Sequence, residues 1–144
     1  MIRLIDPYSR GQQAGLTLVR LAVGFFMIYH GAEIFSNEKM NGYLHWDMFK
    51  HSSAGGILIY AGKTAELVSG IFLLIGLFTR VAAVVLICTM SYISFFVGSG
   101  KIWYEDQHPF LFVLLGLVFL FVGGGKWSLD HLLYNEIVNQ NAGY

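Results

Sequence analysis

The sequence predicts an all-α fold, a membrane four-helix bundle followed by a short C-terminal interfacial amphipathic helix. Four long apolar runs lie in a chain of only 144 residues, of which 56% are hydrophobic. Only 12% are charged, against roughly 25% in a typical soluble domain. Ionisable residues of both signs lie inside the first two runs. Because a charge inside the bilayer is costly, such residues must pair, face water or take part in function.

The four runs can be assigned as spans because a bilayer is crossed by about 20 apolar residues in a helix. The expected spans are residues 14–35, 55–78, 81–98 and 108–122. Only the turn Thr79-Arg80 separates the second span from the third, so these two helices should be antiparallel neighbours. Four spans take up more than half of the chain. Residues 1–144 should therefore form one transmembrane domain.

Two segments outside the spans should have structure of their own. Residues 36–53 form the only long polar loop that the sequence predicts. Residues 128–138 should form a helix that Ser128 caps and that lies in the membrane interface, since apolar residues recur along it at helical spacing. The apolar stripe consists of Leu129, Leu132, Leu133, Ile137 and Val138.

The charges within the first two spans should meet in pairs. Arg20, His30 and Glu33 lie in the first span, and Lys63 and Glu66 lie in the second. At a helical rise of about 1.5 Å per residue, Arg20 should reach Glu66, and Lys63 should reach His30 or Glu33. Small residues on the same faces would let the two helices approach closely. They are Gly24 and Gly31 in the first span and Gly62, Ser69 and Gly70 in the second.

Two interpretations of these buried charges remain open at this stage. They could be structural ion pairs that fix the register of the bundle, a role that buried pairs have in some proteins. They could instead form a polar pocket between spans one and two for a quinone headgroup, a proton or a small anion. Glu105 and His108 could stand at the mouth of that pocket, or act only as loop and capping groups.

Other candidate sites have simpler explanations. Three potential metal ligands share the polar loop, but their spacing matches no zinc signature, so we interpret them as solvated loop residues and expect no metal site. They are His45, Asp47 and His51. Cys88 is the only cysteine, which excludes an intramolecular disulfide or a CxxC redox pair. We also expect no two histidines at facing depths that could bind a haem. The net charge is zero and basic residues are scattered, so nucleic acid is not an expected partner.

Three stretches carry a family resemblance. The first contains Arg20-Leu21, Gly24, Phe26 and His30-Gly31. The second contains Glu66, Gly70, Leu74, Gly76-Leu77-Phe78-Thr79-Arg80 and Ala82-Ala83. The third is the ending Gly123-Gly124-Gly125-Lys126-Trp127-Ser128-Leu129-Asp130. Together, over about residues 14–131, they resemble the DoxX family of small four-helix membrane proteins.

The resemblance implies an inner-membrane bundle. The name-giving members of that family belong to a thiosulfate:quinone oxidoreductase, and others associate with thiol and superoxide stress enzymes. Positions that match the family's motifs are Arg20, His30, Glu66, Arg80, Ser128 and Asp130. A shared fold does not by itself fix a function.

Two hypotheses for the function follow. In the first, the chain is a subunit of a quinone-linked sulfur or thiol oxidoreductase, with quinone as the one ligand that the sequence suggests. In the second, it is a non-enzymatic scaffold or assembly protein. Both place it in the bacterial inner membrane with other subunits as partners. The positive-inside rule favours cytoplasmic termini, with four basic residues on the inner side against three on the outer side. These are Arg3, Arg10, Arg80 and Lys126 inside and Lys39, Lys50 and Lys101 outside.

Overall fold

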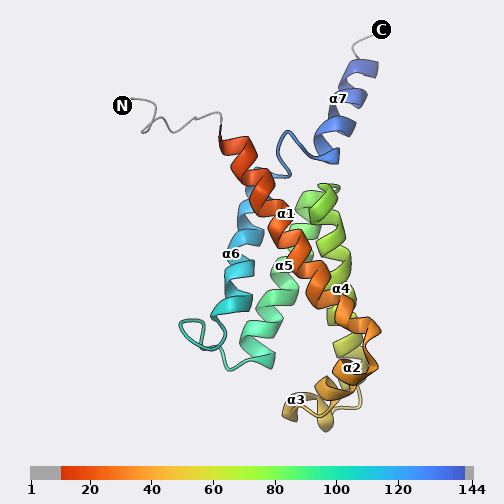
Figure 1. Cartoon of the computed structure of the whole chain (residues 1–144), viewed down its shortest axis with the longest axis vertical. Coiled ribbons are helices and arrows are strands. Elements are labelled where there is room, and N and C mark those ends of the chain that lie inside the picture. Colours follow the sequence, from red (N-terminus) through yellow and green to blue (C-terminus); the bar gives the residue numbers. More distant parts are fainter. Residues whose placement is uncertain (1–10, 142–144) are drawn as a thin grey trace.

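The computed structural model describes residues 11–141, and every regular element in that range is helical (Figure 1). The elements are α1 (Gln12–Gly31), the tight turn η2 (Ala32–Phe35), α2 (Asn37–Leu44), α3 (Asp47–Lys50), α4 (Gly55–Ile75), α5 (Thr79–Tyr92), the π-helical turn η3 (Ile93–Val97), α6 (Gln107–Val122) and α7 (Leu129–Asn141). The expected all-helical fold class is confirmed. Arg3 and Arg10, which the topology argument uses, lie outside the described residues.

Within residues 11–141, three stretches are long and apolar enough to cross a membrane, namely Gln12–Phe35, Gly55–Ile75 and Thr79–Val97. The fourth apolar helix, α6, has 16 residues, which is slightly short for a span. Its place beside α5 is compatible with a membrane helical bundle, and its complete crossing remains a prediction (Figure 1).

The turn between α4 and α5 begins earlier than the apolar run suggests. Helix α4 ends at Ile75, because Gly76 adopts a left-handed conformation with φ 71°. The backbone N–H groups of Gly76 and Leu77 both donate to the carbonyl of Phe72, which closes the last helical turn. Helix α5 then starts at Thr79 rather than at Val81. Hydropathy alone misses this break because Leu77 and Phe78 are apolar turn residues.

The bundle consists of two helix pairs. Helix α1 packs mainly on α4, and α5 packs mainly on α6, while α4 and α5 join the pairs. All four helices contribute to one apolar core. Its buried members are Val23, Met27, Leu73, Ala82, Ala83, Leu86, Met90, Phe112, Val113 and Phe119.

Glycines determine how closely α1 and α4 approach. A Cβ atom added to Gly24 would lie 2.7 Å from the backbone nitrogen of Leu74. One added to Gly31 would lie 2.3 Å from the nitrogen of Leu67. A Cβ atom added to Gly70 would lie 2.7 Å from the backbone nitrogen of Ile28. Gly62 behaves differently from expectation, since an added Cβ would meet nothing within 4 Å.

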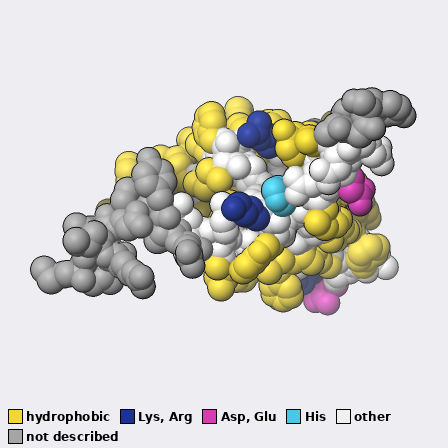
Figure 2. Space-filling view, turned by 90° about the horizontal axis from the view of Figure 1, so that it is seen from above, with side chains coloured by type: hydrophobic (Ala, Val, Ile, Leu, Met, Phe, Trp, Pro, Cys, Tyr) yellow, Lys and Arg dark blue, Asp and Glu magenta, His cyan; other side chains and the backbone are white. Residues whose placement is uncertain are grey.

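The outer surface of the bundle is apolar. Large hydrophobic side chains point away from the core all around it, among them Leu18, Phe25, Ile57, Val81 and Phe121. Figure 2, which looks onto one end of the molecule, shows hydrophobic side chains around much of the perimeter, with basic side chains nearer the middle and acidic ones at the edge. Contiguous apolar surface of this kind is typical of helices that contact lipid.

The polar segment 36–53 folds into two short helices against the end of α4. Ser36 caps α2, its hydroxyl accepting from the backbone N–H of Lys39 at 3.4 Å. Met40 and Phe49 pack with Ile59 of α4 in a small second core. This segment therefore covers one end of the bundle, and we call it the α2–α3 cap.

Helix α7 forms where the sequence predicts a C-terminal helix, although its side chains make few contacts with the bundle. The stripe residues Leu132, Leu133 and Ile137 are exposed. In Figure 1, α7 points away from the end of the bundle rather than across it. A position flat in the membrane interface is therefore not the conformation seen here, and it remains a prediction.

The close crossing of α1 and α4 predicts that Gly31→Ala is destabilising by about 1–3 kcal/mol, since overpacking forces backbone shifts. Gly15→Ala, in the same helix but with nothing within 4 Å, should be neutral or stabilising by up to about 1 kcal/mol. Thermal unfolding in detergent measures both. Equal melting temperatures for the two variants would contradict the close crossing.

Candidate functional site

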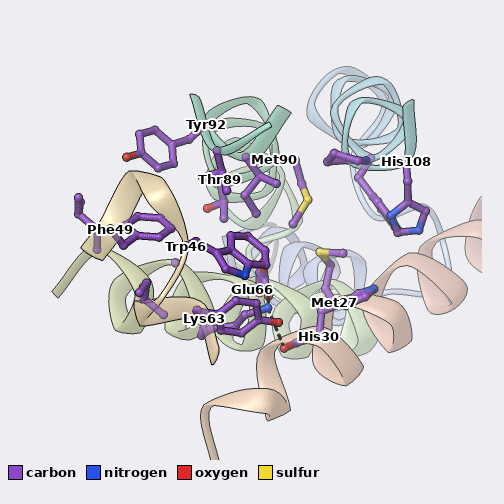
Figure 3. Close-up of a pocket in the computed structure, with 18 residues that line it drawn as sticks. Met27, His30, Trp46, Phe49, Lys63, Glu66, Thr89, Met90, Tyr92 and His108 are labelled. Carbon is purple, nitrogen blue, oxygen red and sulfur yellow. Dashed lines mark hydrogen bonds and ion pairs between the residues drawn. The ribbon is translucent and has the colours of Figure 1, made fainter. Parts of the chain in front are cut away.

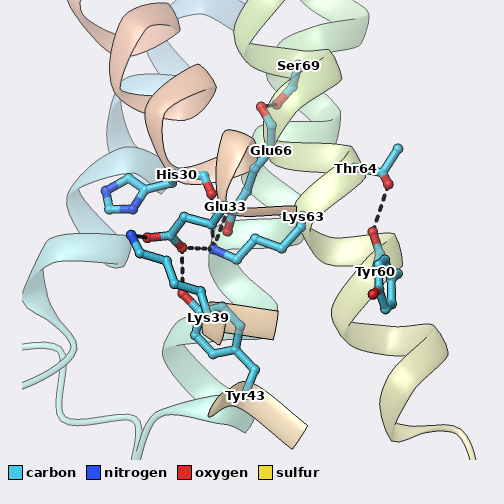
Figure 4. Close-up of polar contacts among 9 residues, drawn as sticks. All are labelled: His30, Glu33, Lys39, Tyr43, Tyr60, Lys63, Thr64, Glu66 and Ser69. Carbon is cyan, nitrogen blue, oxygen red and sulfur yellow. Dashed lines mark hydrogen bonds and ion pairs between the residues drawn. The ribbon is translucent and has the colours of Figure 1, made fainter. Parts of the chain in front are cut away.

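A chain of charged side chains joins α1 and α4 next to the α2–α3 cap (Figure 4). The Lys63 ammonium lies 2.9 Å from a carboxylate oxygen of Glu33 and 2.9 Å from one of Glu66. It also lies 3.4 Å from the backbone carbonyl of His30. Lys63 and Glu66 are three residues apart on α4, whereas Glu33 arrives from the tight turn that ends α1. The structure thus confirms the expected contact between Lys63 and Glu33.

Glu33 connects this chain to the surface. Its carboxylate accepts from Lys39 at 2.7 Å and from the hydroxyl of Tyr43 at 2.5 Å. The ring of Tyr43 also lies beneath the Lys63 ammonium, 5.0 Å from the ring centre. Burial, followed by the hydrogen bond to Glu33, raises the pKa of Tyr43. The hydrogen bond to Glu33 raises the pKa of Lys39.

A cavity of about 220 Å³ lies beside this charged chain, between the two helix pairs and beneath the α2–α3 cap (Figure 3). Most of its lining is apolar or aromatic, and its few polar groups include His30, Lys63, Glu66, Thr89 and His108. The remaining lining residues are Met27, Tyr43, Trp46, Phe49, Leu58, Ile59, Gly62, Met90, Tyr92, Ile93, Val97, Pro109 and Phe112. Such a combination is typical of small-molecule sites.

Two histidines meet at one side of the cavity. The ring of His30 on α1 lies 5.9 Å from the ring of His108 on α6. These two histidines therefore lie at similar depths, whereas the expectation concerned only a pair that could bind a haem. Glu105 does not line the cavity, since it pairs with Lys101 at 3.2 Å on the exposed loop. The buried carboxylate of that loop belongs to Asp106, which accepts from the backbone N–H groups of Ser99 and Lys101.

The expected contact between Arg20 and Glu66 is wrong. Arg20 is 1% exposed, and its guanidinium donates to the carbonyls of Leu73 at 2.5 Å and Leu74 at 2.9 Å. The other terminal nitrogen donates to the carbonyl of Trp127 at 2.8 Å. The glycine contacts place Gly24 beside Leu74, so Arg20, one turn earlier, lies level with the end of α4 and well beyond Glu66.

Arg20 belongs instead to a second polar cluster at the opposite end of the bundle, which we call the C-terminal clamp. Asp130 accepts from the backbone N–H groups of Phe78 at 2.6 Å and Thr79 at 2.8 Å, and so caps the start of α5. Its own N–H donates to the carbonyl of Gly76 at 2.9 Å. Ser128 packs against Gly76 and Gly124 and bonds to the carbonyl of Gly125 at 2.6 Å. None of the clamp residues lines the cavity.

The sequence did not predict several of the residues that line the cavity. These are Tyr43, Trp46 and Phe49, which come from the α2–α3 cap. The aromatic content of the polar loop was the available signal, because three aromatic residues fall within seven positions there. The loop residues His45, Asp47 and His51 do not line the cavity, and Asp47 pairs with Lys50.

Comparison with known proteins gives one family and one relative. The model of the DoxX family matches residues 15–99. An uncharacterized protein of Haemophilus influenzae is 31% identical over 130 residues, which cover 84% of this chain and 92% of that protein. No solved structure matches this chain.

The separation of the two polar clusters predicts the outcome of double-mutant cycles. Glu66→Leu and Lys63→Leu should be non-additive by about 0.5–3 kcal/mol, because the two side chains form one ion pair. Glu66→Leu and Arg20→Lys should add to within about 0.3–0.5 kcal/mol, because they share no partner. Unfolding in detergent measures both cycles. A coupling energy between Arg20 and Glu66 as large as that between Lys63 and Glu66 would contradict the assignment of Arg20 and Glu66 to separate clusters.

The raised pKa values of Tyr43 and Lys39 predict a loss of stability at alkaline pH. A group whose pKa is higher in the folded state stabilises below its unfolded pKa, near 10 for these types, and that stabilisation disappears as the pH rises through the folded value. Tyr43→Phe should therefore flatten the fall in melting temperature above about pH 10. Tyr104→Phe, on an exposed loop, is the matched control and should leave the profile unchanged.

Proposed function

Since the chain belongs to the DoxX family of membrane proteins, we propose that it is a membrane subunit of a larger redox complex and that its cavity binds a quinone headgroup. The observation that carries the proposal is the cavity of about 220 Å³, with aromatic walls and a few polar groups. The resemblance to a family whose name-giving members belong to a thiosulfate:quinone oxidoreductase supports the same ligand.

The shape and chemistry of the cavity suit a quinone ring. The volume equals that of about seven water molecules at roughly 30 Å³ each, which is enough for a small substituted ring. Aromatic side chains such as Trp46 and Phe112 offer faces and edges against which a flat ring can pack. Polar groups lie on the α1 and α4 walls, where Glu66 and Lys63 stand beside His30 (Figure 3).

The polar groups have distinct roles in this proposal. A neutral histidine ring can donate a hydrogen bond to a quinone carbonyl, and the Glu66 carboxylate can accept one from a quinol hydroxyl. Lys63 is already held by two carboxylates, so it balances the charge of Glu66 rather than binding the ring. Reduction of a quinone to a quinol consumes two electrons and two protons, and we assign delivery of the electrons to a partner subunit.

The second candidate function is a scaffold or assembly protein without catalytic activity. The observation that favours it is α7, whose apolar side chains Leu132, Leu133 and Ile137 are exposed beyond the end of the bundle. In that case the charged chain around Lys63 only fixes the register of α1 and α4, and the cavity has no ligand of its own.

We propose the inner membrane and cytoplasmic termini as the location. Arg80 and Lys126 would then lie at the cytoplasmic end of the bundle, together with the C-terminal clamp. Lys39, Lys50 and Lys101 would lie at the outer end, with the cavity and the α2–α3 cap. This orientation puts the ligand site in the outer leaflet.

Fluorescence of Trp46, which lines the cavity, tests the proposal. In a Trp103→Phe, Trp127→Phe background, a short-chain quinone added to protein in nanodiscs should quench Trp46 saturably, because a ring in the cavity lies close to the indole. His30→Leu and Glu66→Leu should each raise the Kd at least tenfold, about 1.4 kcal/mol.

The control is His45→Leu, which changes a histidine outside the cavity and should leave the Kd unaltered. Linear, collisional quenching that is identical in all variants would contradict quinone binding and favour the scaffold function.

A further inference from the structure

The contact between α1 and α6 is a weak seam at one side of the cavity. Helix α1 packs on α4 and α6 packs on α5, whereas α1 and α6 make little contact with each other. Ring contacts bridge them at two points, His30 with His108 at 5.9 Å and Phe26 with Phe112 at 6.4 Å. We call these four residues the α1–α6 seam.

The seam connects the cavity with the outer surface of the bundle. His30, His108 and Phe112 line the cavity directly. Phe26 is 49% exposed on the outward side, and His108 is exposed as well. Figure 3 shows His30 and His108 at one side of the lining, away from Phe49 and Tyr92 at the other. A molecule in contact with the exposed face of Phe26 is thus one layer of side chains away from the cavity.

Two other walls of the cavity are more strongly built. The α2–α3 cap closes the outer end through Tyr43 and Phe49, and Phe49 is buried against Met40 and Ile59. The α1–α4 wall is held by the glycine crossing and by the ion pairs of Lys63. Side chains at the seam, in contrast, touch across only by ring edges, which can move apart by rotamer changes without loss of a hydrogen bond or an ion pair.

We infer that ligands reach the cavity sideways from the lipid, between α1 and α6, and that the natural ligand therefore has a long apolar tail. The inference rests on the proposed quinone site, and it adds the route by which the ligand reaches that site and the ligand's apolar tail. The ring passes between His30 and His108, and the tail remains in the seam against Phe26 and Phe112. The histidine pair at this opening can form hydrogen bonds with the oxygens of the quinone ring, while the flanking phenylalanines can pack against the hydrocarbon tail.

Reversible blocking of the seam tests the inference. In a Cys88→Ser background with Trp46 as the single tryptophan, Phe26→Cys is labelled with an aromatic methanethiosulfonate. The association rate of a decyl-tailed quinone is then measured by Trp46 quenching in nanodiscs. The label should slow association at least tenfold, and the rate should recover after the label is cleaved and the reductant is removed. His108→Cys is the second variant at the same seam.

The matched control is Ile57→Cys, which is 73% exposed to lipid on α4 and does not line the cavity. Its labelling should change the rate less than twofold. Saturable binding with an unchanged rate after labelling at both seam positions would overturn sideways access between α1 and α6. Absence of saturable quenching in the unlabelled parent would instead count against the quinone site itself, so the two failures are distinguishable.

Discussion

The close crossing of α1 and α4 is the constraint on which both polar clusters depend. Gly24, Gly31 and Gly70 let the two backbones approach until side chains on one helix reach main-chain groups of the other. Lipid gives helices no hydrophobic reason to associate, so small residues at a contact are the main source of close packing. Once this register is fixed, Arg20 can only be level with the end of α4, and Glu33 can only be level with Lys63.

The two ends of the bundle are built in opposite ways. At one end, the C-terminal clamp ties α1, α4, α5 and the start of α7 together, largely through backbone groups of Gly76, Phe78 and Thr79. At the other end the helix pairs are separated by a cavity, and α5 changes to a π-helical turn at Ile93–Val97. A π-helical turn shifts the side chains that follow it and is common at functional sites.

The sequence predicted what depends on hydropathy and helical spacing, and missed what depends on main-chain partners. The helices and the approach of Lys63 to Glu33 follow from apolar runs and residue depth. The partner of Arg20 could not be found that way, because backbone carbonyls are acceptors at every position and leave no trace in the sequence. His30 was expected in the pocket and His108 at its mouth, but their ring contact could not be predicted, because the approach of α6 to α1 is a tertiary property. The family resemblance contained a usable signal, since its three stretches supply Arg20, Gly76 and Asp130, which meet in one clamp.

The placement of Glu66 argues that the charged chain does more than fix the helix register. A buried pair that serves only as a structural link is best surrounded by packed protein, because each ion must recover the solvation that it loses. Lys63 has two carboxylates, a backbone carbonyl and the ring of Tyr43 around it. Lys63 and Glu66 nevertheless both line the cavity, so packed protein surrounds neither of them completely. Lys63 compensates the charge of Glu66 from one side, and the cavity lies on another. Under the proposed function, a carboxylate placed in this way accepts a hydrogen bond from a ligand that brings a hydroxyl group to the cavity, such as a quinol.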